Sequence, residues 1–217
     1  MSNKIDHKLD HVLIMGPPGA GKTMWARRQA QRWPFPQKES AADRSYIYHV
    51  AGMQVPGLNS GHGNIKDYPP FRAPHHTVSR VAMTGKFEKD YRWRPGELNL
   101  AHGGTLFIDE APEFRRDVLK RIIHAAKTGV VTHESREARI AVPTRFRLVA
   151  AMNPCPCGWH GVADNQTQCS RTCSCTQDQV TRYMKRVEDL LKICRLIPAA
   201  EWQAELKEMV AREGVGA

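Results

Sequence analysis

The sequence has no long hydrophobic run and no export signal. None of its apolar stretches reaches the roughly 18 residues that a membrane-spanning helix needs. The opening segment, MSNKIDHKLDH, is polar, whereas a secretory signal carries an apolar stretch. Internal repeats and long low-complexity runs are also missing, which excludes repeat architectures. We therefore expect a globular protein of the cytoplasm with no membrane partner.

Acidic residues are outnumbered by basic ones. The chain has 217 residues, with 32 Lys and Arg against 22 Asp and Glu, which gives a net charge of +10. This sign favours a polyanionic partner, nucleic acid first; the alternative is charge that serves solubility alone. The length suffices for one domain with a sizeable core. Six cysteines in a cytoplasmic chain indicate thiols or metal ligands before disulfides.

Strand-like and helix-like segments alternate along the chain. Residues 52–76 are expected to be mostly loop, 129–142 a β-hairpin, and a long helix is expected from Gln177 along an apolar stripe that ends at Cys194 in the core. This alternation predicts an α/β fold with a parallel sheet flanked by helices. Buried strands are expected at 11–15, 45–50, 105–109 and 146–153. Helices are expected at 24–32, 115–127 and 200–212, with short ones near 77–83 and 95–102.

Residues 16–23, GPPGAGKT, fit the phosphate-binding pattern G-x-x-x-x-G-K-[ST]. A glycine-rich turn between a strand and a helix directs backbone N–H groups at phosphate oxygens. Lys22 is expected to reach the β- and γ-phosphates of a nucleotide, and Thr23 to offer its hydroxyl to Mg²⁺. The alternative is a glycine turn that binds no nucleotide. The turn itself consists of Gly16, Pro17, Gly19, Gly21 and the residues between them.

Two further strands end in polar residues. The segment TLFIDE ends in Asp109 and Glu110, and the strand at 146–153 ends in Asn153. The carboxyl ends of parallel strands form the edge where such sheets bind ligands. Asp109 is expected to hold Mg²⁺ with Thr23, Glu110 to polarise the attacking water, and Asn153 to orient that water. The alternative for the two carboxylates is a solvated acidic turn.

Four cysteines form two C-x-C pairs within the segment 155–175. Four thiolates can make a tetrahedral zinc site, which would close a long loop that has little apolar content. The alternative is a set of reduced thiols without metal. The expected ligands are Cys155, Cys157, Cys173 and Cys175, with Cys169 and His160 as alternates.

Several segments together resemble one known family. GPPGAGKTM, FRAPHHT, RPGELNLAHGGTLFIDEAPEF and RFRLVAAMNPCPCG are similar to the AAA+ domain of magnesium-chelatase-like ATPases. Within that family they resemble the ComM/YifB-type branch, which is linked to DNA branch migration during natural transformation. The resemblance runs from about residue 11 to about residue 187. It implies an AAA+ core, a ring-shaped oligomer, usually a hexamer, and ATP between neighbouring subunits.

The resemblance also implies two insertions that face the pore of the ring, around 84–96 and 129–142. Their basic residues are expected to follow a phosphate backbone, and Tyr91 and Trp93 are candidates for base stacking. The alternative is a solvated basic loop with a packed tryptophan. His75 and His76, which fall in the family's APHH motif, are candidates for ligands or catalytic residues, and the alternative is a structural or polar pair in a loop. The basic residues are Lys86, Lys89, Arg92, Arg94, Arg136 and Arg139.

The sequence departs from the family pattern in its C-terminal part. The segment that supplies the family's arginine finger has no clean counterpart, although Arg186 and Arg195 lie near its position. The family's additional N-terminal domain and long helical lid are not recognisable either. A partner chain could supply these parts.

The sequence therefore predicts two regions and one main function. Residues 1–176 form the AAA+ core, and residues 177–217 form a short helical C-terminal segment, a truncated lid. The predicted function is an ATP-binding and ATP-hydrolysing protein that remodels DNA or drives branch migration as a ring oligomer. One alternative is a nucleotide-dependent switch or scaffold with weak hydrolysis. The other is the motor subunit of a metal chelatase, which the net charge and the cysteine segment disfavour.

Overall fold

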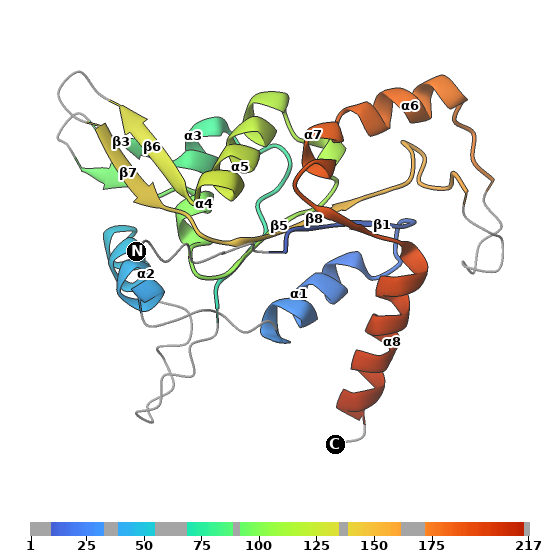
Figure 1. The fold of residues 1–217 in the computed structure, drawn as a ribbon, viewed down its shortest axis with the longest axis horizontal. Helices are drawn as coiled ribbons and strands as arrows, with labels where there is room; N and C mark the ends of the chain where they lie inside the picture. The colour runs from blue at the N-terminus through green and yellow to red at the C-terminus, as the bar shows by residue number, and fades with distance from the viewer. Residues whose placement is uncertain are drawn as a thin grey trace, which may run out of the picture.

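A five-stranded parallel sheet lies at the centre of the fold. The computed structural model describes residues 10–32, 39–54, 69–88, 92–134, 139–161 and 172–214. The strands of the sheet are β1 (Val12–Met15), β2 (Phe71–Arg72), β5 (Thr105–Ile108), β8 (Arg147–Met152) and β9 (Arg195–Ile197). They lie in the order β2-β5-β8-β1-β9, and each adjacent pair is parallel (Figure 1). The predicted α/β class with a parallel sheet is confirmed.

Helices cover both faces of this sheet. One face packs against α1 (Lys22–Arg32) and α8 (Ala199–Gly214), which lie below the sheet in Figure 1. Val12 and Ile14 point to this face, whereas Leu13 points to the other. Because both faces are buried, the strands are continuously apolar and do not alternate with polar residues. The other helical elements are α2 (Glu39–Val50), α3 (Arg80–Thr84), α4 (Glu97–Leu100), η1 (Ala111–Glu113), α5 (Arg116–Thr128), α6 (Gln177–Lys185) and α7 (Glu188–Leu191).

Two small antiparallel hairpins lie at the end of the sheet opposite its carboxyl edge. The predicted hairpin at 129–142 is present as β6 (Val130–Glu134) and β7 (Arg139–Pro143), and β3 (Lys86–Phe87) pairs with β4 (Trp93–Arg94). Helix α5 leads to the first of them: it runs back along the sheet and ends at Gly129, whose φ of +71° turns the chain into β6. Figure 1 shows both hairpins at the left, away from α6 and α8.

No helix within the described residues is both long enough and apolar enough to span a bilayer.

The strand predicted at 45–50 is wrong, because these residues form the second half of α2. Among residues 42–50 of this helix, the buried side chains are Arg44, Ile47 and Tyr48, a spacing of three and four residues that is typical of a helix. Tyr46, between them, is 64% exposed. The aromatic and β-branched residues suggested a strand, but the face that they share with Arg44 packs on α4, where the Tyr48 hydroxyl donates to the Leu100 carbonyl at 2.8 Å.

The single long helix predicted from Gln177 to Cys194 is also wrong. The chain forms α6 and α7 and then enters the sheet as β9 beside β1. The apolar stripe is buried as predicted, including Cys194 at 8% exposure. The helix nevertheless ends early, because the backbone of Arg195 pairs with the carbonyl of His11 and Ile197 fills the face covered by α8. Strand pairing at the open edge of β1 thus outweighs the local helical periodicity.

Trp202 joins α8 to the turn after β1, and its loss is expected to be costly. The ring is fully buried, its Nε1 donates to the Met15 carbonyl at 3.1 Å, and a Cβ on Gly16 would lie 2.7 Å from its Cζ2. Trp202→Ala should lower the free energy of unfolding by about 3–5 kcal/mol through the cavity it leaves. Urea titration checks this value. Tyr46→Ala is the control, since a substitution at this exposed site should change the free energy of unfolding by less than about 0.5 kcal/mol. Equal losses of stability in the two variants would contradict the packing role of Trp202.

Candidate functional site

The loop between β1 and α1 wraps around the side chain of Lys22. Its ammonium donates hydrogen bonds to the carbonyl oxygens of Gly16 at 2.8 Å and Pro17 at 2.9 Å, and the residue is only 8% exposed. Burial lowers the pKa of Lys22, and the nearby carboxylates of Asp109 and Glu110 oppose this shift. The positive charge that a phosphate would meet is therefore held in place by carbonyl groups of the loop itself.

Two glycines allow this loop to turn tightly over α8. Gly19 has a φ of +74° and Gly21 a φ of +90°, in the region that favours glycine. A Cβ on Gly21 would also lie 2.9 Å from Leu206 Cδ2. The loop therefore rests directly on α8. Gly19 is needed for the conformation of the loop, whereas Gly21 is needed for both conformation and space.

Asp109 and Glu110 follow β5 at the carboxyl edge of the sheet. The Thr23 hydroxyl donates to Asp109 Oδ2 at 3.2 Å, so two oxygen donors of the kind that Mg²⁺ prefers come together from α1 and β5. Among the described residues, Glu110 is the one non-glycine with a positive φ, at 52°. Such a conformation costs on the order of 1–3 kcal/mol and is concentrated at functional positions.

His76 lies beside Glu110, a contact that the sequence did not reveal. Its Nδ1 is 3.5 Å from Glu110 Oε2, and its ring lies 4.0 Å from the ring of His75 and 6.5 Å from that of Phe114. His75 is fixed in turn by Thr77, whose Oγ1 lies 2.9 Å from His75 Nδ1. The histidine pair thus borders the carboxylate expected to be the base. The two histidines follow β2, a strand that the sequence analysis did not predict.

Asn153 lies at the end of β8, opposite the phosphate-binding loop. Its Oδ1 accepts a hydrogen bond from Lys22 Nζ at 3.0 Å. Its backbone also hydrogen-bonds to Tyr183, whose pKa is raised to about 12 by burial and by Glu113. The structure therefore brings together the five residues predicted to act on a nucleotide. They are Lys22, Thr23, Asp109, Glu110 and Asn153.

The four cysteines of the two C-x-C pairs meet in one cluster. The sulfur atoms of Cys155, Cys157, Cys173 and Cys175 all lie within 4.8 Å of one another. The separations are 3.2 Å for Cys155–Cys157, 3.8 Å for Cys155–Cys173 and 3.6 Å for Cys157–Cys173. A tetrahedral ion with Zn–S bonds of about 2.3 Å requires sulfur separations of roughly 3.8 Å. The cluster therefore has the composition and size of a zinc site.

The surroundings of the cluster also suit thiolate ligands. The backbone N–H of His160 donates to Cys155 Sγ at 3.3 Å, and that of Cys175 donates to Cys173 Sγ at 3.4 Å. Although desolvation opposes it, hydrogen bonds from the Trp159 backbone and from Cys155 lower the pKa of Cys157 to about 6. The pKa of Cys175 is instead raised to about 12: a backbone hydrogen bond opposes this shift, but desolvation and hydrogen bonds with Cys157 and Cys155 outweigh it. The pKa of Cys173 is also raised, so the negative charge of the metal-free cluster is concentrated on Cys157. Of the alternate ligands, His160 lies at the margin, with Nδ1 3.9 Å from Cys173 Sγ. Cys169 is outside the described residues.

The cysteine cluster is in contact with the phosphate-binding loop. Gly158, in the turn after Cys157, has a φ of +89°, and a Cβ there would lie 2.6 Å from Pro18 Cδ. The same segment begins at Asn153, and its second cysteine pair leads directly into α6. The cluster therefore ties the end of β8 and the start of α6 to the loop that holds Lys22.

Of the six predicted basic residues of the hairpins, three are paired with glutamates in the part of the chain that the structure describes. Lys86 Nζ and Arg94 Nε both lie 3.0 Å from Glu88 Oε1, and Arg139 Nε lies 3.2 Å from Glu134 Oε1. Arg92 lies directly before β4. Trp93 packs against the cluster of buried side chains on α2 and α4, which favours the packed alternative for this residue. Lys89, Tyr91 and Arg136 are outside the described residues.

The chain is similar to proteins of several organisms. It is 36% identical over 177 residues to the uncharacterized protein YifB of Escherichia coli (strain K12), covering 82% of this chain and 32% of that protein. It is 35% identical over 179 residues to competence protein ComM of Haemophilus influenzae, with 82% and 31% covered. Magnesium-chelatase subunit ChlI of Trieres chinensis is 28% identical over 167 residues, with 70% and 47% covered. The chain thus spans about a third of the length of the first two relatives.

A solved structure has a similar fold. The complex between subunits BchI and BchD of magnesium chelatase contains a chain that matches with a TM-score of 0.50 and 18% identity, over 96% of this chain and 69% of that one. This likeness supports the AAA+ fold predicted from the sequence. The family described as magnesium chelatase, subunit ChlI, matches residues 7–196, which is most of the sequence. The chain therefore belongs to the magnesium chelatase ChlI family.

Proposed function

We propose that the chain is an ATP-binding and ATP-hydrolysing AAA+ module that acts on DNA within a ring-shaped oligomer. The observation that carries this proposal is the meeting of Lys22, Asp109 and Asn153, with Thr23 and Glu110, at one edge of the sheet. An ammonium, a hydroxyl–carboxylate pair and a second carboxylate are together the groups that phosphoryl transfer to water needs.

Each residue of this set has a distinct role. The backbone of residues 16–21 would hold the phosphates, and Lys22 would face the β- and γ-phosphates as a point charge. Thr23 and Asp109 would hold Mg²⁺, which neutralises charge that develops on the phosphate oxygens. Glu110 would take the proton of the attacking water, and Asn153 would orient that water.

The four-cysteine cluster is proposed to hold a structural zinc ion. Its donors are four sulfurs that all lie within 4.8 Å of one another, a closed set that leaves no open position for a substrate. Zinc in this position would fix the segment between β8 and α6. It would thereby support the residues of the nucleotide site without contacting a nucleotide.

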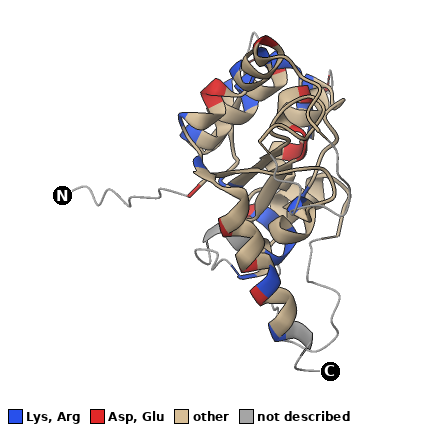
Figure 2. Ribbon diagram, turned by 90° about the vertical axis from the view of Figure 1, so that its right-hand side faces the viewer, with Lys and Arg blue, Asp and Glu red and all other residues tan. Residues whose placement is uncertain are grey.

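DNA is the proposed partner because the net charge is +10 and the basic residues are widely distributed. Figure 2 shows Lys and Arg spread over several helices instead of gathered in one element. One relative carries the name competence protein. A hexameric ring, completed by neighbouring copies or by a partner chain, is part of the proposal.

A nucleotide-dependent switch with weak hydrolysis is the second candidate. Both arginines near the expected finger position are engaged within their own chain. Arg186 Nη1 lies 3.9 Å from Glu113 Oε2, and Arg195 Nη1 lies 3.1 Å from Glu201 Oε1. A finger must instead reach the nucleotide of a neighbouring subunit, so a ring in which both arginines keep these ion pairs would hydrolyse ATP slowly.

The rate of ATP hydrolysis per chain, measured against protein concentration with and without DNA, separates the two candidates. A ring that supplies an arginine finger should raise this rate steeply with concentration, since such a finger contributes about 10³–10⁵-fold in related enzymes. DNA should raise it further. A flat, low rate under both conditions would favour the switch and contradict the ATPase ring.

A further inference from the structure

The proposed function leaves the two histidines after β2 without a role, although the structure fixes their position. The backbone N–H of Val78 donates to the His75 carbonyl at 2.9 Å, so His76 and Thr77 form the middle of a turn. Val78 packs against the main hydrophobic core. The turn is therefore anchored at its end, and it holds His76 beside the end of β5.

His76 lies against both ends of the short helix η1, which begins directly after Glu110. Its Nδ1 is 3.5 Å from Glu110 Oε2, and its ring meets that of Phe114 edge-on, with the centroids 6.5 Å apart. Glu110 caps the start of η1 and Phe114 caps its end, where the ring is buried in the core. The imidazole is thus aligned on the element that carries the carboxylate expected to act as the base.

The backbone of Glu110 is fixed by hydrogen bonds of its own, but its side chain is not. Its N–H donates to Asp109 Oδ1 at 2.9 Å, and its carbonyl accepts from the Glu113 N–H at 2.7 Å. The carboxylate lies beyond several rotatable bonds and is 52% exposed. Within the described part of the chain, His76 is the side chain that contacts this carboxylate. It is therefore the group that can fix the direction of the base.

A metal-binding role suits the histidine pair poorly. The rings of His75 and His76 lie with their centroids 4.0 Å apart and their planes 36° from parallel. Because the nitrogen lone pairs lie in the ring planes, such rings direct them side by side and not at a common ion. His75 Nδ1 also lies 2.9 Å from Thr77 Oγ1. Among the described residues, the group arranged to hold a metal ion is the cysteine cluster.

We propose that His76 is a positioning residue for Glu110, holding one carboxylate oxygen so that the other faces the water that attacks the γ-phosphate. The proposal rests on the proposed ATP hydrolysis and adds the group that orients its base. An ionised carboxylate only accepts hydrogen bonds, so the imidazole donates through its Nδ1–H. The separation of 3.5 Å exceeds a direct hydrogen bond of about 3.2 Å, as catalytic contacts often do before substrate binds.

The first test separates kcat from KM. His76→Ala should lower kcat for ATP by roughly 10- to 100-fold, because a misplacement of about 1 Å can cost a catalytic group about 100-fold in rate. KM and the affinity for a fluorescent ATP analogue should stay the same, since the phosphate contacts come from Lys22 and from the backbone of residues 16–21. Phosphate release is measured without DNA, at protein concentrations where the rate per chain has levelled off. A raised KM with unchanged kcat would overturn the proposal.

His76→Asn is the conservative variant. The amide nitrogen of asparagine is bonded to Cγ, as the imidazole Nδ1 is, and it also carries hydrogen to donate. This variant should therefore restore most of the rate that His76→Ala loses. Thermal unfolding of each variant shows whether the fold is retained. A rate as low as that of His76→Ala, in protein that unfolds like the unchanged chain, would contradict the positioning role.

The next test repeats the change in protein that lacks the carboxylate. If His76 acts through Glu110, then His76→Ala combined with Glu110→Gln should hydrolyse ATP no more slowly than Glu110→Gln alone. An independent effect on the fold or on the nucleotide would lower the rate by the same factor in both backgrounds. Single-turnover measurements compare these slow rates, and equal factors would rule the positioning role out.

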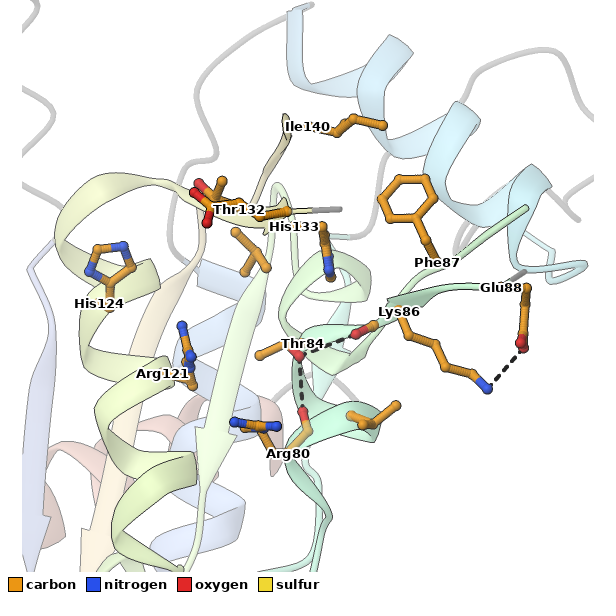
Figure 3. A pocket seen from close by; sticks show the side chains of 14 residues that line it. Arg80, Thr84, Lys86, Phe87, Glu88, Arg121, His124, Thr132, His133 and Ile140 are labelled. Carbon is orange, nitrogen blue, oxygen red and sulfur yellow. Dashed lines mark hydrogen bonds and ion pairs between the residues drawn. The ribbon is translucent and has the colours of Figure 1, made fainter. Parts of the chain in front are cut away.

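His124→Ala is the matched control, because it removes a histidine far from the nucleotide site. His124 is exposed on α5 and lines a cleft of about 620 Å³ between α3, α5, β3 and the β6–β7 hairpin (Figure 3). This cleft lies at the end of the sheet opposite its carboxyl edge. The control should therefore keep both kcat and KM, and a loss of kcat equal to that of His76→Ala would count against the proposal.

These outcomes separate the positioning role from the proposed function. If Glu110→Gln slows turnover as expected while His76→Ala hydrolyses ATP like the unchanged protein, the positioning role is overturned and the proposed ATPase stands. If the unchanged protein hydrolyses no ATP at any concentration, both are overturned.

Discussion

Replacing Glu110 with glutamine is expected to lower ATP turnover by about 10²–10⁴-fold, the usual contribution of a positioned general base. Glutamine keeps the size of the side chain but removes the carboxylate that would take the proton of the attacking water. Nucleotide affinity should persist, because the phosphate contacts come from Lys22 and from the backbone of residues 16–21. Phosphate release measures turnover, and titration with a fluorescent ATP analogue measures affinity.

Two further variants serve as controls for Glu110→Gln. Asp117→Asn also converts a carboxylate into an amide, but Asp117 is 42% exposed and pairs with Arg115, so turnover should be retained. Lys22→Ala should show the opposite pattern from Glu110→Gln: nucleotide binding itself should be lost, because the charge that faces the β- and γ-phosphates is removed. Turnover by Glu110→Gln at the rate of the unchanged protein would mean that another group acts as the base.

The purified, reduced protein is expected to contain about one zinc ion per chain, and Cys157→Ser or Cys173→Ser should lose it. Structural zinc binds with about 10–16 kcal/mol in small domains. If about 4 kcal/mol of the zinc-binding free energy stabilises the fold, loss of the ion should lower the midpoint of thermal unfolding by roughly 8–16 °C. Elemental analysis and a thermal melt on the same samples measure both quantities.

Cys194→Ser is the control for the zinc measurement. Cys194 is buried among apolar side chains of the core, and burial raises its pKa to about 12. This change should therefore leave the zinc content intact, whatever it does to stability. Freshly prepared protein that contains no zinc would reduce the cluster to four neighbouring thiols and remove the proposed metal from the description of the site.

The parts of the fold that were correctly predicted are those with a strong local pattern. β1, β5 and β8 are apolar runs followed by a glycine turn or a polar residue, and both faces of each are buried. The amphipathic stripe of α5 and the hairpin after it were also evident in the sequence. Such segments carry their structural signal within a few residues.

The segments that were mispredicted depend on partners far away in the sequence. In α2 the residue that completes the buried face is Arg44, whose charge concealed the helical spacing. The strand β9 has three residues and becomes a strand because β1 offers it an open edge. β2 has only two residues and pairs with β5. No local periodicity predicts such short strands.

The candidate site likewise has residues that the sequence revealed and contacts that it did not. The phosphate-binding loop, the carboxylates after β5 and the asparagine after β8 were recognisable because each is a short pattern at the end of a strand. The approach of His76 to Glu110 was not, since it requires knowing that the segment after β2 crosses the end of β5. Likewise, the pairing of Lys86 and Arg94 with Glu88 depends on the register of a hairpin.

The contact between Gly158 and Pro18 has a thermodynamic consequence. If a metal ion on the four thiols restrains the turn at Pro18 in the conformation that binds a nucleotide, the metal raises nucleotide affinity by a certain factor. The nucleotide then raises the metal affinity by the same factor, because the coupling is reciprocal. A chelator and a nucleotide would then act as antagonists although they share no ligand atom. The Gly158–Pro18 contact would in this way make the supply of metal one of the quantities that set how much ATP the protein holds.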